Sequence, residues 1–316
     1  MAQAFFGGVH PHDMKAATNE KAIEQLAPPA TVVIPMSMHF GAPCTPIVKV
    51  GDQVKVGQKI GEFKGLGAPI HASVSGTVKA IEPRPYSMGG NITSVVIEND
   101  MQDEVSEEVQ APADPNALSV EEMVEIVKNA GIVGMGGATF PTDIKAVTAQ
   151  GRVDTILVNA CECEPYITAD DALLCSYPEQ IFRGLAALDA ALHPDRRVIA
   201  VEDNKSEAIA ILRRHLPDWP GVELAVLPTR YPQGAEKQLI QAVTGRQVPP
   251  GHLPFSVGCA VFNAGTVAAV YRAVYEGKPV TKRIVTVTGE GVKEPKNLIV
   301  RIGTPFAQVI EAAGGL

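Results

Sequence analysis

Residues 155–160 read TILVNA, and two later segments, RRVIAVED (196–203) and VELAVLP (222–228), are likewise short apolar runs with β-branched residues. Helix-like stretches alternate with these runs, at 178–192, 206–216 and 235–243. This alternation predicts a parallel sheet with helices on both faces, and ligands bind such folds beyond the carboxyl ends of the strands. We therefore expect a binding site that begins where TILVNA ends.

The rest of the chain divides around this α/β region. Ser119, followed by acidic Glu121 and Glu122 and by apolar residues at helical spacing, predicts the start of a helix. Upstream, short runs between glycines, among them TVVIPM (31–36) and IVKV (47–50), predict the strands of a small all-β module. The expected parts are an N-terminal segment (1–30), the all-β module (31–100), an acidic solvated linker (101–118), the α/β domain (119–280) and an incomplete last unit of two strands and a helix (281–316).

Composition excludes several classes of function. The chain has 316 residues, 46% hydrophobic and 20% charged, with a formal net charge of −8. Nucleic acid is not an expected partner, because phosphate backbones require clustered Lys and Arg. No apolar run is long enough for a membrane span, and the N-terminus lacks the pattern of a secretory signal. The five cysteines include no C-x-x-C pair, so neither a disulfide framework nor a metal or iron–sulfur motif is expected in this chain.

The all-β module resembles the lipoyl and biotinyl carrier family, whose domains are barrel-sandwich hybrids. GDQVKVGQKIGE (51–62) and SVSGTVKAI (73–81) match the two halves of the family's pattern. A carrier needs its modified lysine at the tip of an exposed hairpin between these halves. Here the intervening FKGLGAPIHA (63–72) is shorter and places GLG at the expected tip, so Lys64 is a poor site for modification. We expect a non-carrier module that serves as a docking or spacer surface.

Four segments of the α/β domain carry more Gly, Asn, Glu and Lys than a core requires: GMGGATFPTDIK (134–145), NACECEPYITADD (159–171), YPQGAEKQLI (231–240) and VFNAGTVAAVY (261–271). In the first, a glycine-rich backbone that leads into a helix favours the binding of an anion, and Lys145 adds a cation. Each segment alone is also consistent with an ordinary turn, and Lys145 alone with a solvated lysine. Their order along the chain is the stronger signal.

Together the four segments resemble the flavin-binding subunit of respiratory complex I. That family's patterns are G-x-G-G-A-x-F-P-T-x-x-K, N-x-x-E-x-E-P, Y-x-x-G-x-E and N-x-x-T, and they fall here on Gly134 to Lys145, Asn159 to Pro165, Tyr231 to Glu236 and Asn263 to Thr266. Met135 stands where complex I has an arginine. The N-terminal FFGGVHPHDMK (5–15) and the barrel-sandwich module narrow the resemblance to the RnfC family of the Rnf ion-translocating electron-transport complex, over essentially the whole chain.

This resemblance implies a multidomain α/β fold. A small all-β barrel-sandwich hybrid would be followed by a Rossmann-like parallel-sheet domain that binds FMN and NADH, and then by the start of a soluble-ligand-binding β-grasp domain. Family members continue into a ferredoxin-like segment with two C-x-x-C-x-x-C-x-x-x-C-P motifs. We therefore expect the chain to be truncated, with two 4Fe–4S clusters only in the missing segment.

An FMN site needs a neutralised phosphate, partners for the ribityl hydroxyls and polar groups at the edge of the isoalloxazine ring. The resemblance and the residue chemistry place such contacts at Gly134, Gly136, Gly137, Lys145, Asn159, Asn263 and Thr266. The glycines would line the cofactor with backbone and Lys145 would supply charge. Asn159 would reach it from the strand end, and Asn263 with Thr266 from the next helix, although helix capping is an alternative role for Thr266.

The CECEP segment (161–165) predicts a second function for the same site. In an extended chain, alternation would place Cys161 and Cys163 on one side and Glu162 and Glu164 on the other. A zinc or redox pair at the cysteines would lack further ligands at suitable spacing. Two glutamates beside a flavin are instead suited to accept hydrogen bonds from a nicotinamide cofactor, the alternative being a solvated rim.

Glu236 is expected to join these glutamates, and Tyr231 and Gly234 belong to the same family pattern. Hydride transfer from NADH to a flavin depends on stacking and on exclusion of water, so no catalytic acid or base and no metal ligand is expected. His10 and His12, which lie beside Pro11 without a partner cluster, are interpreted as turn residues.

Three functions remain open at this point. The first is an NADH:ferredoxin oxidoreductase-type flavoprotein module of the Rnf complex, a peripheral subunit on the cytoplasmic face of the bacterial inner membrane. Its partners would be the membrane and ferredoxin-type subunits of that complex, NADH and, indirectly, ferredoxin. The second is a cobalamin reductase-like flavoprotein of a microcompartment, and the third a catalytically silent scaffold. The sequence does not distinguish Na⁺ from H⁺ coupling, because ion translocation would reside in other subunits.

Overall fold

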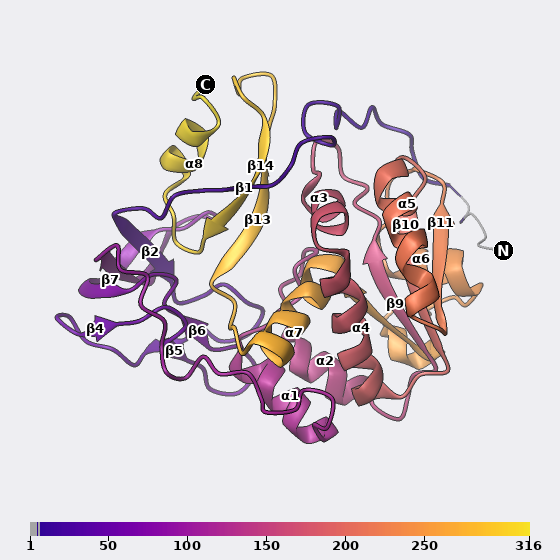
Figure 1. The fold of residues 1–316 in the computed structure, drawn as a ribbon, viewed down its shortest axis with the longest axis horizontal. Coiled ribbons are helices and arrows are strands. Elements are labelled where there is room, and N and C mark those ends of the chain that lie inside the picture. Colours follow the sequence, from indigo (N-terminus) through magenta and orange to yellow (C-terminus); the bar gives the residue numbers. More distant parts are fainter. Residues whose placement is uncertain (1–4, 6) are drawn as a thin grey trace.

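The computed structural model describes residue 5 and residues 7–316. An all-β body and an α/β body lie side by side, and a small C-terminal unit sits above the all-β body (Figure 1). Among the described residues, no helix is both long and apolar enough to cross a membrane.

The all-β body contains two antiparallel sheets, one with the order β2-β8-β7-β4 and one with the order β3-β5-β6. Its strands are β2 (Thr31–Pro35), β3 (Thr45–Pro46), β4 (Gln53–Val54), β5 (Lys59–Glu62), β6 (Ile70–His71), β7 (Gly76–Pro85) and β8 (Asn91–Asn99). Alternation along β2 buries Val32 and Ile34 against Ile60 and Ile97, all at 0% exposure. The alternating apolar residues therefore produce the core of a barrel-sandwich module.

The expected strand at IVKV (47–50) is wrong. Residues 49–52 form a turn instead, in which Oδ2 of Asp52 accepts a hydrogen bond from the backbone N–H of Lys49 at 2.8 Å. Gly51 takes φ +96°, a conformation that favours glycine, and its N–H donates to the carbonyl of Val78 at 2.8 Å. The Asp side chain and the glycine thus favour a turn over continued extension.

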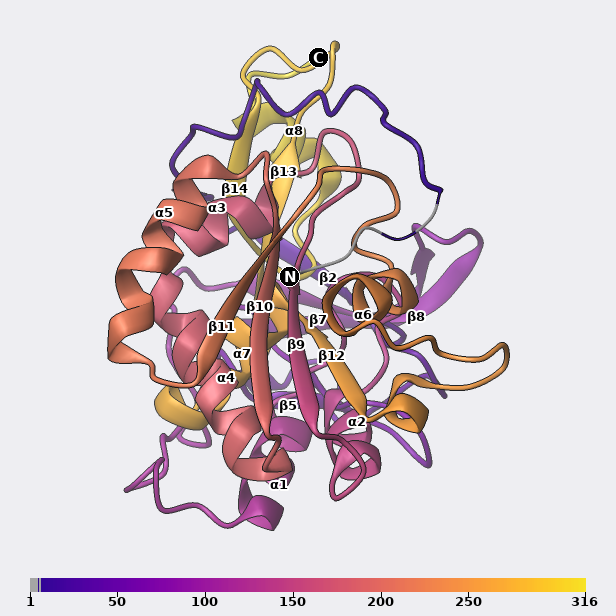
Figure 2. The ribbon, with the colours of Figure 1, turned by 90° about the vertical axis from the view of Figure 1, so that its right-hand side faces the viewer.

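The α/β body is organised on a parallel sheet with the order β11-β10-β9-β12. The strands are β9 (Thr155–Ala160), β10 (Arg196–Glu202), β11 (Val222–Leu227) and β12 (Cys259–Asn263). The first three strands in chain order are laid down in one direction, and the fourth is added on the other side of β9, as Figure 2 shows. The strand order therefore reverses between β9 and β12, which is where doubly wound folds bind their ligands.

Helices cover both faces of this sheet, as the βα alternation predicts. One face packs against α1 (Val120–Asn129), α2 (Thr142–Ala149), α3 (Ala169–Ser176), α4 (Pro178–Leu192), α5 (Ser206–His215) and α7 (Ala264–Glu276). The other face packs against α6 (Glu236–Thr244). Short 3₁₀ turns occupy Leu216–Asp218 and Pro254–Val257.

The start of α1 is as the sequence predicts. Ser119 and Glu122 form a capping box, in which each side chain accepts a hydrogen bond from the backbone N–H of the other residue.

The C-terminal unit consists of β13 (Lys282–Val287), β14 (Lys296–Arg301) and α8 (Phe306–Ala312), which confirms the two strands and helix expected there. A strand from the N-terminal segment, β1 (Glu24–Gln25), pairs in parallel with β14. Arg301 attaches this unit to the all-β body by donating from Nη1 to the carbonyl of Ser73 at 2.7 Å. The pairing of β1 with β14 has no local signal in the sequence, because it joins distant segments of the chain.

Candidate functional site

Asn159 and Asn263 end β9 and β12, and they are register partners in the parallel sheet. The amide Nδ2 of Asn159 donates to the carbonyl of Gly234 at 2.7 Å, and its Oδ1 accepts from the N–H of Cys161 at 3.1 Å. The Oδ1 of Asn263 caps α7 by accepting from the N–H of Thr266 at 3.3 Å. The two asparagines thus hold the loops that leave the sheet at its point of strand reversal.

A cavity of about 430 Å³ opens beside these asparagines. Loops after β9, β11 and β12, the glycine-rich loop and β13 all contribute to its wall. Its lining residues are Met135, Gly136, Asn159, Cys161, Glu162, Glu164, Ile167, Ala169, Asp170, Leu173, Gly234, Asn263, Gly265, Arg272, Lys282, Arg283, Ile284, Val285 and Thr286. The lining includes six residues named from the sequence: Gly136, Asn159, Glu162, Glu164, Gly234 and Asn263.

The other six residues named from the sequence, Gly134, Gly137, Lys145, Tyr231, Glu236 and Thr266, do not line this cavity. Lys145 and Glu236 form an ion pair with 2.9 Å between Nζ and Oε1, and Nζ of Lys145 also donates to the carbonyl of Val261 at 2.8 Å. Tyr231 is 41% exposed and pairs with Val9 through its backbone. Lys145 therefore lies in a ligand-free contact with the residue expected to bind nicotinamide.

Close backbone approaches shape two sides of the cavity. A Cβ on Gly234 would lie 2.2 Å from the carbonyl oxygen of Cys161, so only glycine is compatible with this packing. A Cβ on Gly136 would lie 3.1 Å from Cβ of Asn263. Thr266 anchors the glycine-rich loop, since its Oγ1 accepts from the N–H of Met135 at 2.9 Å. This side-chain contact was not expected from the sequence, which offered Thr266 only as a ligand contact or a capping residue.

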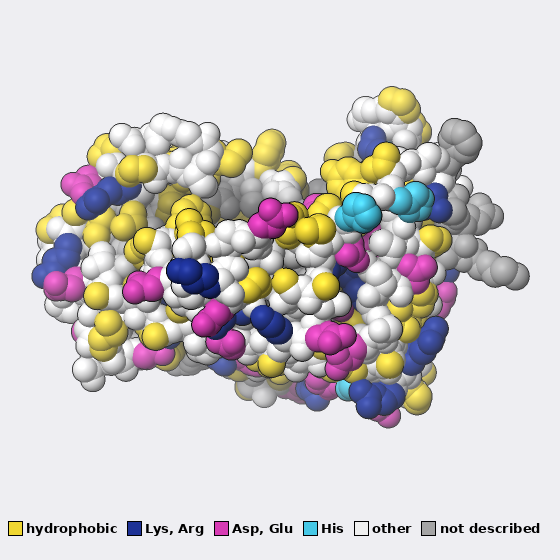
Figure 3. Space-filling view, turned by 90° about the horizontal axis from the view of Figure 1, so that it is seen from above, with side chains coloured by type: hydrophobic (Ala, Val, Ile, Leu, Met, Phe, Trp, Pro, Cys, Tyr) yellow, Lys and Arg dark blue, Asp and Glu magenta, His cyan; other side chains and the backbone are white. Residues whose placement is uncertain are grey.

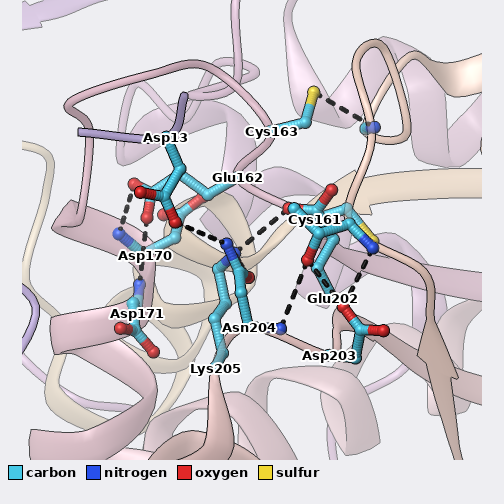
Figure 4. Close-up of polar contacts among 12 residues, drawn as sticks. Asp13, Cys161, Glu162, Cys163, Asp170, Asp171, Glu202, Asp203, Asn204 and Lys205 are labelled. Carbon is cyan, nitrogen blue, oxygen red and sulfur yellow. Dashed lines mark hydrogen bonds and ion pairs between the residues drawn. The ribbon is translucent and has the colours of Figure 1, made fainter. Parts of the chain in front are cut away.

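Glu162 and Glu164 have different surroundings, so the expected common side for the two glutamates is wrong. Glu162 is 6% exposed, and its Oε1 accepts from the N–H of Asp170 at 2.9 Å at the start of α3 (Figure 4). Glu164 is exposed at the cavity wall. The helix α3 was missed in the sequence, and its free amides are the physical reason that Glu162 turns inward.

Buried carboxyl groups at the cavity are poorly ionised. Burial, and next the charge of Asp170, raise the pKa of Glu162 to about 8. Burial also raises the pKa of Asp170, whose Oδ2 accepts a hydrogen bond from Nδ2 of Asn263 at 2.6 Å. At neutral pH the protonated form of Glu162 therefore predominates, and the acidic side of the cavity carries less negative charge than its composition suggests.

The N-terminal segment crosses over the loops that follow the parallel strands, as Figure 2 shows. Lys15 is 5% exposed, and its Nζ donates to the carbonyls of Glu162, at 2.7 Å, and Ile167. The carbonyl of Asp13 accepts from the N–H of Tyr166 at 2.8 Å. Sequence reasoning missed Lys15, because its acceptors are backbone carbonyls far along the chain.

A basic wall completes the cavity. Arg272 comes from α7, and Lys282 and Arg283 come from β13, so the α/β domain and the C-terminal unit share this wall. Acidic and basic side chains are interspersed on the face drawn in Figure 3, without a broad basic patch. The basic wall was also missed in the sequence, because no motif links the end of α7 to β13.

Comparison with known domain families agrees with this architecture. Residues 3–102 match the RnfC barrel sandwich hybrid domain, residues 127–272 the Nuo51 FMN-binding domain and residues 284–316 the SLBB domain. A solved structure of an NAD⁺-reducing [NiFe]-hydrogenase, in the H₂-reduced state, aligns with a TM-score of 0.54 and 25% identity. That alignment covers 63% of this chain and 40% of the hydrogenase chain. The fold and the site thus define a flavin-domain protein of the Nuo51 type, preceded by a barrel-sandwich hybrid.

Curated relatives specify the family. The RnfC-type subunit of the Na⁺-translocating ferredoxin:NAD⁺ oxidoreductase complex of Acetobacterium woodii is 44% identical over 98% of this chain and 71% of its own length. The corresponding subunit of the proton-translocating complex of Clostridium ljungdahlii is 43% identical over 100% of this chain and 69% of its own length. For that of the ion-translocating oxidoreductase complex of Klebsiella pneumoniae, the values are 41% identity, 98% of this chain and 41% of the relative. The chain belongs to the RnfC subunit family of ion-translocating ferredoxin:NAD⁺ oxidoreductase complexes.

Proposed function

We propose that the cavity binds FMN and that the chain is the NADH-interacting flavoprotein module of a membrane-associated electron-transport complex. The observation that carries this proposal is the pairing of Asn159 with Asn263 at the point of strand reversal, beside a cavity of about 430 Å³. The names of the curated relatives favour this function over a cobalamin reductase-like flavoprotein.

The residues present are compatible with a flavin nucleotide. The cavity volume lies within the range of roughly 300–1,000 Å³ that is typical of small-molecule sites. Gly136 exposes backbone at the wall, and Asn159 and Asn263 offer amide groups for polar atoms of the cofactor. Apolar Ile167, Leu173 and Ile284 would surround a ring system; Leu173 is already buried in the core. When bound, the flavin supplies the chemistry that accepts a hydride from NADH and releases electrons singly.

The protein's own contribution is positioning. Glu164 is exposed at the cavity wall and can accept hydrogen bonds from the ribose or carboxamide of NADH. We propose that Glu236 and Tyr231 extend this contact toward the outer edge of the site, with Lys145 held by Glu236 until a ligand enters. Glu162 holds the loop through α3, so its role is to fix the geometry of the nicotinamide side.

Several wider features belong to the same proposal. We keep the divisions at 1–30, 31–100, 101–118, 119–280 and 281–316, with the last unit as the beginning of a β-grasp domain. Two 4Fe–4S clusters would lie in a ferredoxin-like segment that follows it in family members. The partners would be the membrane and ferredoxin-type subunits, with the chain attached peripherally at the cytoplasmic face of the inner membrane.

The decisive test is flavin binding by the purified chain. After incubation with FMN and removal of the excess, we expect flavin absorbance at close to one FMN per chain, and rapid anaerobic bleaching on mixing with NADH in a stopped-flow instrument. A chain that retains no flavin after reconstitution would contradict the proposal and favour the scaffold function. Retained flavin that NADH does not bleach would support a flavoprotein with another electron donor.

A further inference from the structure

Two arginines of the basic wall converge on the cavity from different parts of the chain. Arg272 lies near the end of α7, and its Nη1 donates to Oε1 of Gln180 at 3.0 Å. Arg283 lies on β13, and its Nη2 donates to the carbonyl of Met135 in the glycine-rich loop at 3.2 Å. Both side chains are partly buried and line the cavity. Each guanidinium has five N–H donors, so these contacts leave most donors available to a ligand.

The positive charges of this pair are poorly compensated. Among the described residues, neither guanidinium forms an ion pair within 4.0 Å. Burial lowers the pKa of Arg272, and the charge of Arg283 contributes to the same direction against the opposite effect of Glu276. Glu276 itself pairs with Lys278 at 2.7 Å. Two neighbouring guanidinium groups taken partly out of water are unfavourable without a counterion, so a bound anion would relieve this cost.

The surroundings also favour an anion here. Gly265 of the cavity wall lies in the first turn of α7, a helix of 13 residues whose positive end faces this region. A Cβ on Gly265 would lie 3.7 Å from Cβ of Met135, the residue whose carbonyl Arg283 contacts. Asp170 is the acidic group that acts on Arg283, and its raised pKa weakens its competition with a ligand.

We propose that Arg272 and Arg283 bind the phosphate group of the nucleotide that enters this cavity. The inference rests on the proposed FMN and NADH site and assigns its anionic end to the wall shared by α7 and β13. Lys145, which the glycine-rich loop suggested for this task, is held by Glu236 and lies outside the cavity lining. Planar guanidinium groups are well suited to phosphate oxygens, which they bind through paired N–H donors.

The phosphate has two sources in this site, the monoester of FMN and the pyrophosphate of the nicotinamide dinucleotide. Riboflavin separates them, because it carries the flavin ring and ribityl chain without the phosphate. In the unmodified chain we expect FMN to bind at least tenfold more tightly than riboflavin, as measured by quenching of flavin fluorescence.

The test compares Arg283→Gln, Arg283→Lys and Arg272→Gln with the unmodified chain. Arg283→Gln and Arg272→Gln should each raise the Kd for FMN about ten- to hundredfold, with the Kd for riboflavin unchanged. Arg283→Lys should recover part of the loss, because it restores the charge without the planar donors. The matched control is Arg213→Gln on the exposed side of α5, which should leave both constants unchanged.

A second titration, of NAD⁺ against flavin-loaded protein by calorimetry, identifies the source of the phosphate. Weaker FMN binding with unchanged NAD⁺ binding assigns the arginines to the flavin phosphate. Weaker NAD⁺ binding with an unchanged ratio of FMN to riboflavin affinity assigns them to the pyrophosphate. If neither constant changes in Arg283→Gln or Arg272→Gln, the inference is wrong although the flavin site stands. If the unmodified chain binds neither FMN nor riboflavin, the proposed function fails first.

Discussion

Asn159 and Asn263 lie side by side at the carboxyl ends of β9 and β12, as register partners of two neighbouring parallel strands. Through Asn159 the sheet holds Gly234, and through Asn263 it holds Thr266 and Asp170. Small displacements of either strand end would therefore alter several walls of the cavity together. This coupling makes the site sensitive to substitutions that change its backbone, and less sensitive to changes on exposed faces.

The glycine-rich loop provides a test of backbone access. Gly136→Val should raise the Kd for FMN more than tenfold, because the added side chain begins 3.1 Å from Asn263 and occupies the wall of the cavity. Gly134→Ala is the matched control, since its Cβ would meet Phe140 at 3.7 Å, an ordinary contact. Fluorescence titration measures both constants, and circular dichroism checks that both variants fold. Normal flavin binding by folded Gly136→Val would refute the role of this loop.

The pKa of Glu162 predicts a pH-dependent stability. Between the pKa of an unfolded Glu, about 4.5, and the folded value of about 8, the folded chain holds a proton that the unfolded chain has lost. Stability from this group is thus fully present below the unfolded pKa and is lost as the pH rises toward 8. In urea denaturation at pH 5 and pH 8, the wild type should lose at least about 1.4 kcal/mol more than Glu162→Gln, the equivalent of one pKa unit.

Glu164→Gln is the control for that experiment, because Glu164 is exposed. Its stability should follow the wild-type pH profile. Equal pH profiles for the wild type and Glu162→Gln would show that the carboxyl is ionised at the same pH in the folded and unfolded chains.

Lys15 should stabilise the loop after β9. Lys15→Met removes the donor for the buried carbonyls of Glu162 and Ile167, and leaving such acceptors unpaired costs about 1–3 kcal/mol. We expect a decrease of this size in the free energy of unfolding, together with weaker FMN binding. Lys64→Met, on an exposed loop of the all-β body, should change neither quantity. A Lys15→Met variant as stable as the wild type would exclude this role.

The proposed nicotinamide contacts predict different effects at two glutamates. Glu164→Gln removes a charge-assisted acceptor worth about 1.5–3 kcal/mol, so the Kd for NADH should rise about ten- to hundredfold with little change for FMN. Glu236 already pairs with Lys145 at a half-exposed position, where such a pair contributes about 0–1 kcal/mol. We therefore expect Glu236→Gln to raise the Kd for NADH about fivefold or less. Bleaching amplitude against NADH concentration provides both values; unchanged affinity in Glu164→Gln would remove that residue from the site.

The all-β body should not act as a carrier. Lys64 is exposed, but it lies in a loop that contains Gly65 and Gly67 and not at the end of a paired hairpin. Intact-mass analysis after co-expression with a lipoyl or biotin ligase should therefore show the unmodified mass. An adduct that maps to Lys64 would reverse this interpretation.

Much of the fold could be predicted because its signals are local. Apolar runs of strand length and helical spacing predicted β9, β10 and β11 together with α4 and α5. The capping box at Ser119 marked the start of α1. Short features were less predictable: α3 was missed and a strand at IVKV was wrong, since a few polar residues decide between a turn and an extended chain.

The sequence by itself determined the order of the domains, the parallel α/β architecture and the loops at the strand ends, because periodicity and glycine placement act over a few residues. Only the tertiary structure decided which of those loop residues share a cavity. It paired Lys145 with Glu236, buried Glu162 against α3, laid Lys15 over the site and brought Arg272 together with Arg283. These arrangements depend on contacts between segments far apart in the chain, which local propensity does not encode, and the charges involved are set by burial that arises only after packing.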